Sequence, residues 1–252
     1  MKPQLLRMVE AALSQSNLEA RINDAQGCVE LLLASPCAEV DYHPLIIDYH
    51  QAYLNFADNS AHAFTLLLKL GNQTCGILPV MIRNYPTSTQ LGSNSADSLP
   101  PFLISSLSRK QKRKLYVKCF DFIKALMINL ELNTFTSQFT FIPGVAESWF
   151  ALLNEKGAVS DFNQQLYCDL NVTEQDYLPL IRDKYRSHIK RAEKLWRVEV
   201  NTRVSDEQLA AFQALHLSVA GKRTRSDHSW QLQQEAVNND AGFMVFAYDD
   251  TD

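Results

Sequence analysis

Two apolar segments separated by a short turn constrain the fold of this chain more than any other feature. Residues 63–70 are rich in aromatic and aliphatic side chains, and residues 74–82 continue in the same way. Gly71 and Asn72, which lie between them, are typical turn residues. The pattern predicts a β-hairpin.

Helix and strand patterns alternate on both sides of this hairpin. Ser108 and Gln111 have the spacing of a capping box, and apolar residues recur behind them at steps of three and four. Gly157 is a suitable residue to end a short helix. Helices are expected over residues 5–13, 28–33, 44–56, 109–131 and 147–156, and strands over residues 138–142 and 164–170. The fold class is therefore a mixture of α-helices and β-strands.

Residues 84–101 contain three prolines, one glycine and many serines and threonines, with little periodicity. We expect a loop of unusual length, and such loops inside compact domains are usually functional or disordered. An active-site flap and a plain mobile excursion both fit the pattern.

The helix and strand signals begin again at Asn171. The pair Thr173 and Asp176 resembles a capping box that opens a helix to about residue 196, and an alternating strand follows over residues 198–203. Ser205 and Gln208 have the spacing of a capping box that opens another helix, and Gly221 is a suitable residue just past its end. A helix beginning near Ser229 and a strand over residues 242–248 complete the pattern. That last strand either pairs with an earlier strand or belongs to a fragment of a longer sheet.

Composition argues against membrane-spanning, secreted and disulfide-linked proteins. No apolar run approaches the roughly 18 to 20 residues of a membrane span, and the first residues do not resemble a secretory signal. The five cysteines are an odd number without a C-x-x-C pair, which favours reduced, mostly buried thiols over disulfides or zinc ligands. We expect a soluble cytoplasmic protein. The net charge of -4 argues against non-specific coating of nucleic acid, and no DNA partner is expected.

Positive charge is nevertheless concentrated in residues 182–197, which contain seven Lys or Arg against two acidic residues. Arg186 and Lys190 belong to a row of cations at steps of four, where like charges on a helix repel each other. One interpretation is a solvated helix face. The other is a site for an anion, whose phosphate groups would offset the repulsion through charge-assisted hydrogen bonds.

The sequence contains two further basic clusters. Residues 109–114 lie where a helix dipole disfavours positive charge, and lysines extending into solvent explain them better than a bound anion does. Residues 221–230 combine Arg223 and Arg225 with His228 and Trp230 in a loop between two helices. His228 could act as a general base because its ordinary pKa lies near neutrality. Alternatively Asp227 caps a helix, His228 lies outside, and Trp230 fills the core.

Several catalytic signatures are missing from the sequence. It contains no Walker A motif, no dinucleotide-binding glycine pattern, no serine-hydrolase elbow and no H-E-x-x-H helix. The histidines lack ligand spacing, so no metal site and no covalently bound cofactor are expected.

Residues 185–194 (YRSHIKRAEK) resemble the Arg-containing helix near the start of the second domain in FemAB-like proteins, a branch of the GNAT superfamily. Residues 221–226 (GKRTRS), followed by Ser229, Trp230 and Gln233, are similar to the next marked segment of that branch. Upstream, residues 76–80, 91–94 and 100–102 look like parts of the family's first domain.

The resemblance implies tandem GNAT-like domains, each a twisted central sheet flanked by helices. The first domain would cover residues 1–170, and residues 171–252 would form the start of a second domain. A GNAT domain continues after the strand matching residues 242–248 with further strands and a phosphate loop, so we expect the second domain to be incomplete and inactive alone.

The resemblance also implies a function. Family members transfer an acyl or aminoacyl group to an amine of a cell-envelope or polysaccharide precursor, with acyl-CoA or aminoacyl-tRNA as donor. Arg186, Lys190, Arg223 and Arg225 would contact the anionic substrate, and His228 would accept a proton. The alternative is a non-catalytic module that binds tRNA or a phosphorylated glycan through the same cations. A pure assembly partner has no feature in its favour.

Overall fold

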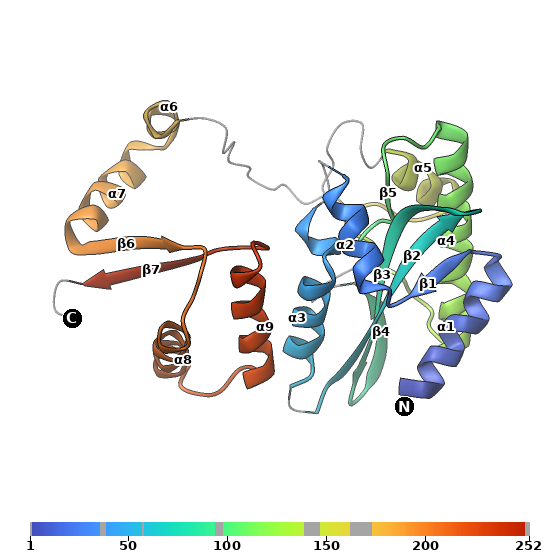
Figure 1. Cartoon of the computed structure of the whole chain (residues 1–252), viewed down its shortest axis with the longest axis horizontal. Coiled ribbons are helices and arrows are strands. Elements are labelled where there is room, and N and C mark those ends of the chain that lie inside the picture. Colours follow the sequence, from blue (N-terminus) through green and yellow to red (C-terminus); the bar gives the residue numbers. More distant parts are fainter. Residues whose placement is uncertain are drawn as a thin grey trace.

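The computed structural model describes residues 2–35, 39–56, 58–93, 98–138, 147–161 and 173–249. The fold is mixed α/β, with two antiparallel sheets and helices around them (Figure 1). One sheet contains β1 to β5 in the order β1-β2-β3-β4, with β5 beside β3, and the other contains β6 and β7. No helix among the described residues is both long enough and apolar enough to cross a membrane.

The predicted hairpin is the centre of the first sheet. β2 (Ser60–Leu70) and β3 (Gln73–Tyr85) pair in antiparallel register, with Leu66 opposite Leu78. Gly71 makes the turn in the left-handed region at φ 63°, which glycine adopts without steric cost. β1 (Ala20–Ile22) extends the sheet on the far side of β2. The hairpin prediction is confirmed.

Helices cover both faces of this sheet, which explains why its central strands are apolar almost throughout. Successive side chains of a strand point to opposite faces. Leu66 and Leu68 therefore pack against α1 (Lys2–Ser16), α4 (Arg109–Asn129) and α5 (Glu147–Glu155). Leu67 and Met81 lie on the other face, in clusters with residues of α2 (Ala25–Leu33) and α3 (Pro44–Leu54) (Figure 1).

The expectation of one long loop over residues 84–101 was wrong in part. β3 continues to Tyr85, and β4 (Ser88–Gly92) returns beside it, with Asn84 opposite Thr89. The backbone ladder forms although the side chains are mostly polar, because the outer part of this hairpin is exposed and needs no apolar pattern. The short strand β5 (Phe102–Leu103) then pairs with β3, while residues 94–97 of the predicted loop lie outside the described residues.

Other predictions for the first half hold where the structure describes them. The Ser108 hydroxyl accepts a hydrogen bond from the Gln111 backbone and the capping box is complete, so α4 begins where its sequence indicates. α4 ends at Asn129, slightly before residue 131. Buried free thiols are found at Cys28, Cys75 and Cys119, whereas Cys37, Cys168 and nearly all of the strands expected at 138–142 and 164–170 lie outside the described residues.

The single helix expected from Thr173 to residue 196 is broken. Thr173 does accept a hydrogen bond from the Asp176 backbone, but α6 (Glu174–Tyr177) gives way to a 3-10 turn at Leu178–Leu180. Pro179 has no N–H to donate and its ring disfavours a continuing α-helix. Ile181 and Arg182 are extended, with ψ of 137° and 141°, and α7 (Asp183–Leu195) begins anew after them.

The second sheet pairs β6 (Trp196–Asn201) with β7 (Met244–Asp249), so the last predicted strand pairs with an earlier one. α8 (Asp206–Ala220) lies between these two strands in the sequence. It begins at a complete capping box formed by Ser205 and Gln208, and it ends at Gly221, which is left-handed at φ 66°. α9 (Asp227–Asn238) starts earlier than the predicted Ser229. Its N-cap is Ser226 rather than Asp227, because the Ser226 hydroxyl accepts from the Ser229 N–H at 3.2 Å.

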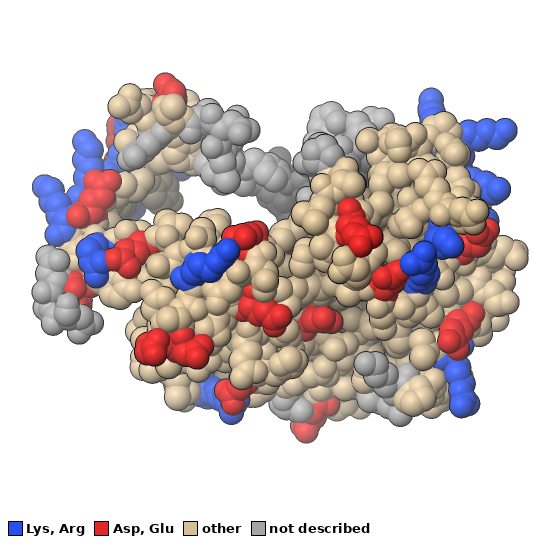
Figure 2. Space-filling view, in the orientation of Figure 1, with Lys and Arg blue, Asp and Glu red and all other residues tan. Residues whose placement is uncertain are grey.

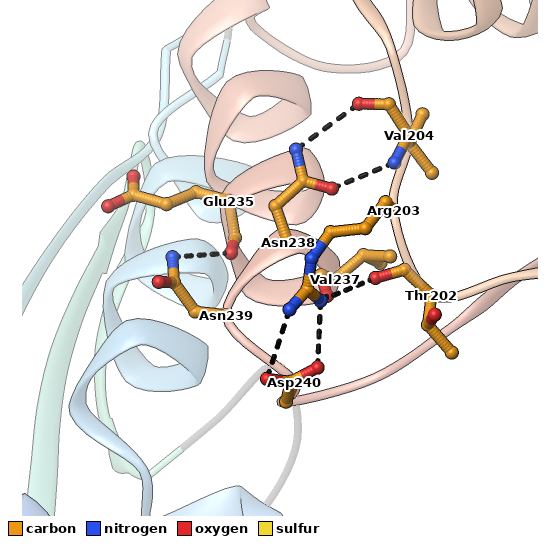
Figure 3. A network of polar contacts seen from close by, with 8 residues as sticks. All are labelled: Thr202, Arg203, Val204, Glu235, Val237, Asn238, Asn239 and Asp240. Carbon is orange, nitrogen blue, oxygen red and sulfur yellow. Dashed lines mark hydrogen bonds and ion pairs between the residues drawn. The ribbon is translucent and has the colours of Figure 1, made fainter.

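A polar network fixes the end of α9 to the link between β6 and α8 (Figure 3). The Arg203 guanidinium donates to both carboxylate oxygens of Asp240, at 2.7 and 3.2 Å. The Asn238 side chain accepts from the Val204 N–H at 2.8 Å and donates to the Val204 carbonyl at 3.2 Å. The two segments are 34 to 37 residues apart in sequence, so this network is a tertiary contact that joins the end of α9 to the segment before α8.

The two halves of the chain share one order of elements. In the first half, α1 is followed by β1, by α2 and α3, and by β2, which returns antiparallel to β1. In the second half, α7 is followed by β6, by α8 and α9, and by β7, which returns antiparallel to β6. We call these the first and second repeat. α3 and α9 hold equivalent places in the two repeats, and they lie against each other (Figure 1).

Candidate functional site between the two repeats

A cavity of about 300 Å³ lies where the first repeat meets the second. α3 supplies three aromatic residues, α8 supplies one histidine, and the link between α8 and α9 supplies two polar residues. These are Tyr49, His50, Tyr53, His216, Thr224 and Arg225. A site of this kind exists only when both repeats are folded and in contact.

α3 is fixed firmly to the sheet, which positions its contribution to the cavity. Pro44 occupies its first turn, and the His43 ring nitrogen accepts from the Leu45 N–H at 3.2 Å. At the other end, the Asn55 side chain exchanges two hydrogen bonds with the backbone of Ala61 in β2, at 2.7 and 3.0 Å. The helix therefore has little freedom to rotate away from the cavity.

Arg225 is the central cation of the site. Its Nη1 donates to the Tyr49 hydroxyl at 3.1 Å and to the Gln233 side-chain oxygen at 3.0 Å. Its guanidinium lies over the Trp230 ring, 3.3 Å from the ring centroid. Cation–π contacts of this kind contribute about 0.5 to 2 kcal/mol, depending on desolvation. Arg225 is thus held by residues of both repeats.

Trp230 connects the cavity wall to the core of the second repeat. It is 5% exposed and belongs to a cluster with Leu209, Val237 and Met244. The His216 ring meets it edge-on at 5.2 Å between centroids. The expectation that Trp230 fills the core is therefore confirmed, whereas the cap expected at Asp227 is at Ser226. The Trp230 ring also supports the Arg225 guanidinium.

The backbone of the link between α8 and α9 is braced by its own side chains. Arg223 Nε donates to the Arg225 carbonyl at 3.1 Å, and the Arg223 guanidinium pairs with Asp227 at 2.6 Å. The Ser226 hydroxyl donates to the Ala52 carbonyl of α3 at 3.3 Å. These contacts hold Thr224 and Arg225 at the cavity and leave Arg223 on its outer side.

His50 is the least satisfied polar group of the cavity. Its Nδ1 is buried and finds no hydrogen-bond partner among the described residues. Burial lowers the pKa of His50, and the negative charge of Asp41 opposes that shift. The environment therefore favours the neutral imidazole, which can accept or donate a proton at its other nitrogen.

The residues predicted from the sequence do not all meet here. Arg225 lines the cavity, Arg223 stands beside it, and His228 is exposed in the first turn of α9 without being part of the lining. Arg186 and Lys190 belong to α7, on the side of the second sheet away from α8 and α9 (Figure 1). Arg186 pairs with Asp183 there, and Figure 2 shows Lys and Arg side chains interspersed with Asp and Glu side chains at the left of the molecule.

Sequence reasoning missed the contribution of α3. Tyr49 and Tyr53 are one helical turn apart, which places them on one side of the helix, while Ile47 and Leu54 pack toward the sheet. An aromatic pair opposite an apolar stripe was the available signal. His216 carried no such signal, because only packing against Trp230 brings it to the site.

The arrangement is suited to binding an anion. A fixed guanidinium, a hydroxyl and two imidazoles can donate hydrogen bonds to carboxylate or phosphate oxygens, and the tyrosine rings can flank a planar group. Among the residues that the structure describes, no group of three or more His, Cys, Asp or Glu side chains could hold a metal ion.

Comparison with known proteins gives one informative result. The sequence matches no family model and no curated protein. Among solved structures, the crystal structure of FemX is similar, with a TM-score of 0.56 and 14% sequence identity. The match covers 91% of this chain and 57% of the FemX chain, so the chain spans little more than half of that protein. The fold of this chain is therefore a FemX-like mixed α/β fold.

Proposed function

We propose that this chain belongs to a transferase of Fem type, which moves an acyl or aminoacyl group onto an amine of a cell-envelope or polysaccharide precursor. The observation that carries the proposal is Arg225, an arginine fixed by both repeats on the wall of a cavity in a FemX-like fold. A guanidinium held in this way suits an anionic group of a nucleotide-linked acceptor.

The repeated order of elements supports the further proposal of tandem GNAT-like domains. A helix, a strand, two helices and an antiparallel return strand occur twice along the chain. We place the first domain at residues 1–170 and the beginning of the second at residues 171–252. The chemistry would then use both domains, because the cavity lies between them.

In the proposed reaction the neutral amine of the acceptor attacks the carbonyl carbon of a thioester or an aminoacyl ester. The new C–N bond forms while the bond to the donor's sulfur or ribose oxygen breaks; the amine loses one proton, and the leaving sulfur or oxygen takes up one proton to depart as a thiol or hydroxyl. We assign proton acceptance to His228, which is exposed at the start of α9. Arg223 and Arg225 would hold the acceptor's anionic group.

Arg186 and Lys190 lie apart from the cavity, so we assign them to a second anionic contact. Their helix is exposed and rich in Lys and Arg. The phosphates of acyl-CoA or of an aminoacyl-tRNA end are the donor groups that such a surface suits.

The test has a binding arm and a transfer arm. Binding of a nucleoside diphosphate, with UDP as the probe, is measured by calorimetry for the wild type, Arg225→Ala and Arg225→Lys. We expect at least a tenfold loss for Ala and an intermediate loss for Lys, because a lysine cannot reproduce the fork of donors. Arg113→Ala, which removes an exposed arginine of α4 that pairs with Glu155 of α5, is the matched control. Equal affinity in all variants would refute the anion site.

The transfer arm mixes labelled acetyl-CoA or charged tRNA with an amine-bearing nucleotide-linked acceptor. Label in the acceptor, reduced by His228→Ala, supports the transferase. The second candidate is a non-catalytic module that binds tRNA or a phosphorylated glycan, and the cationic surface of α7 favours it. Binding of tRNA that falls steeply with salt, together with no transfer from either donor, would establish the module instead.

A further inference from the structure

α3 presents two different faces, and one of them contacts the second repeat. Ile47 is 1% exposed and packs toward the sheet with Ala61 and Met81. Tyr49 and Tyr53 belong to the opposite side, where α9 lies. The tyrosines therefore stand at the contact between the repeats rather than in the core of either one.

Only one nitrogen of the Arg225 guanidinium, Nη1, donates hydrogen bonds to other described residues. Nη1 carries two hydrogens, and these go to Tyr49 in the first repeat and Gln233 in the second. Within the described residues, no hydrogen bond from Nε or Nη2 is found. The Nε–Nη2 edge is the edge that binds carboxylate or phosphate with two parallel hydrogen bonds.

Stacking on Trp230 restrains the guanidinium further. A planar group 3.3 Å from the ring centroid cannot tilt freely, and the Tyr49 and Gln233 acceptors fix its remaining rotation within that plane. The Tyr53 ring is farther away, 5.9 Å from the guanidinium carbon, and its hydroxyl makes no hydrogen bond with Arg225. Of the two tyrosines, Tyr49 alone fixes the direction of the free edge.

We propose that Tyr49 is a positioning residue through which the first repeat sets the affinity of Arg225 for an oxyanion. The inference rests on the proposed function, since it concerns the same cavity. It adds that anion binding and the α3–α9 contact are linked: an anion bound on the free edge favours the docked repeats, and docked repeats favour the anion. Linkage of this kind is reciprocal by thermodynamic necessity.

The experiment uses the whole chain and inorganic pyrophosphate as the probe. Tyr49→Phe removes one hydroxyl and keeps the ring, so we expect the dissociation constant to rise about three- to tenfold. Tyr85→Phe, at the end of β3 and outside the cavity lining, is the matched control and should change the constant less than about twofold. Gln233→Leu removes the other acceptor of Nη1 and should weaken binding in the same direction as Tyr49→Phe.

A merely structural role for Tyr49 is distinguished by thermal unfolding. We expect the ligand-free midpoints of Tyr49→Phe and Tyr85→Phe to agree, while pyrophosphate raises the midpoint of Tyr85→Phe more than that of Tyr49→Phe. If Tyr49→Phe fails to fold, Tyr49→Leu, which removes the same hydroxyl, is compared with the wild type in the same binding and unfolding measurements.

Three results would overturn the inference: no pyrophosphate binding by the wild type, equal affinity of Tyr49→Phe and wild type, or equal losses in Tyr49→Phe and Tyr85→Phe. None of them involves transfer. If the variants differ in pyrophosphate affinity as predicted but no acyl transfer is found, Tyr49 remains a positioning residue and only the proposed transferase activity is refuted.

Discussion

Gly76 of β3 is the position where the smallest substitution should have a large effect. A Cβ atom added there would lie 2.3 Å from the Phe102 carbonyl oxygen and 2.6 Å from Cδ2 of Leu103. The Leu103 side chain could move, but Phe102 belongs to the backbone of β5, which pairs with β3 at this point. The added methyl group must therefore displace the strand.

The magnitude follows from the contacts that β5 would lose. Gly76 faces Leu103 and Ile77 faces Phe102 in the ladder, and the Ile104 N–H donates to the Cys75 carbonyl at 3.1 Å. Losing two such hydrogen bonds costs about 2 kcal/mol. Strain from overpacking adds about 1 to 3 kcal/mol. We expect Gly76→Ala to lower the unfolding free energy by about 3 to 5 kcal/mol.

Urea unfolding followed by far-ultraviolet circular dichroism measures this change, provided that the transition slope is the same in both proteins. Gly242→Ala is the control, because a Cβ at that position meets nothing within 4 Å and the φ angle of Gly242 is not positive. It should change stability by less than about 0.5 kcal/mol. A Gly76→Ala protein within about 1 kcal/mol of the control would refute the steric argument.

Three further predictions concern stability and reactivity. The hydrogen bond and the positive charge of Arg203 lower the pKa of Asp240 below 3.8, so this ion pair stabilises the folded protein above that pH and ceases to do so as the pH falls through the folded pKa. The unfolding free energy of Asp240→Asn, measured from pH 2 to pH 7, should therefore depend less on pH than that of the wild type. Burial raises the pKa of the Cys28 thiol to about 12 and that of Cys75 to about 11, so a variant retaining only these two cysteines should react with a thiol reagent at pH 8 only after denaturation. Leu126→Ala in α4 should cost about 2 to 5 kcal/mol in urea unfolding, whereas Ile128→Ala two residues later, at a side chain that is 67% exposed, should cost less than about 1 kcal/mol.

Local signals in the sequence were sufficient for most of the elements. The turn at Gly71, the capping boxes at Ser108 and Ser205, and the glycine after α8 each act within a few residues, so the sequence reports them directly. β4 was missed because its side chains are largely exposed and polar, and only its backbone pairing with β3 makes it a strand.

The helix predicted from Thr173 to residue 196 shows the converse error. Its apolar spacing continued through the segment and concealed Pro179, whose missing N–H interrupts the backbone ladder whatever the side-chain pattern. The observed break separates α7 from α6 and places Arg186 and Lys190 on a helix of their own.

Only part of the candidate site could be predicted from the sequence. Arg225, Thr224 and Trp230 lie within seven residues of one another, so the sequence identified their loop as chemically rich. Tyr49, however, is 176 residues away from Arg225 along the chain. By itself the sequence determined the helices with clear caps, the central hairpin and the cationic loop, because their causes are local. The tertiary structure alone decided that α3 meets α9 and that a tyrosine of the first repeat holds an arginine of the second, because that contact depends on the packing of two surfaces that no local pattern describes.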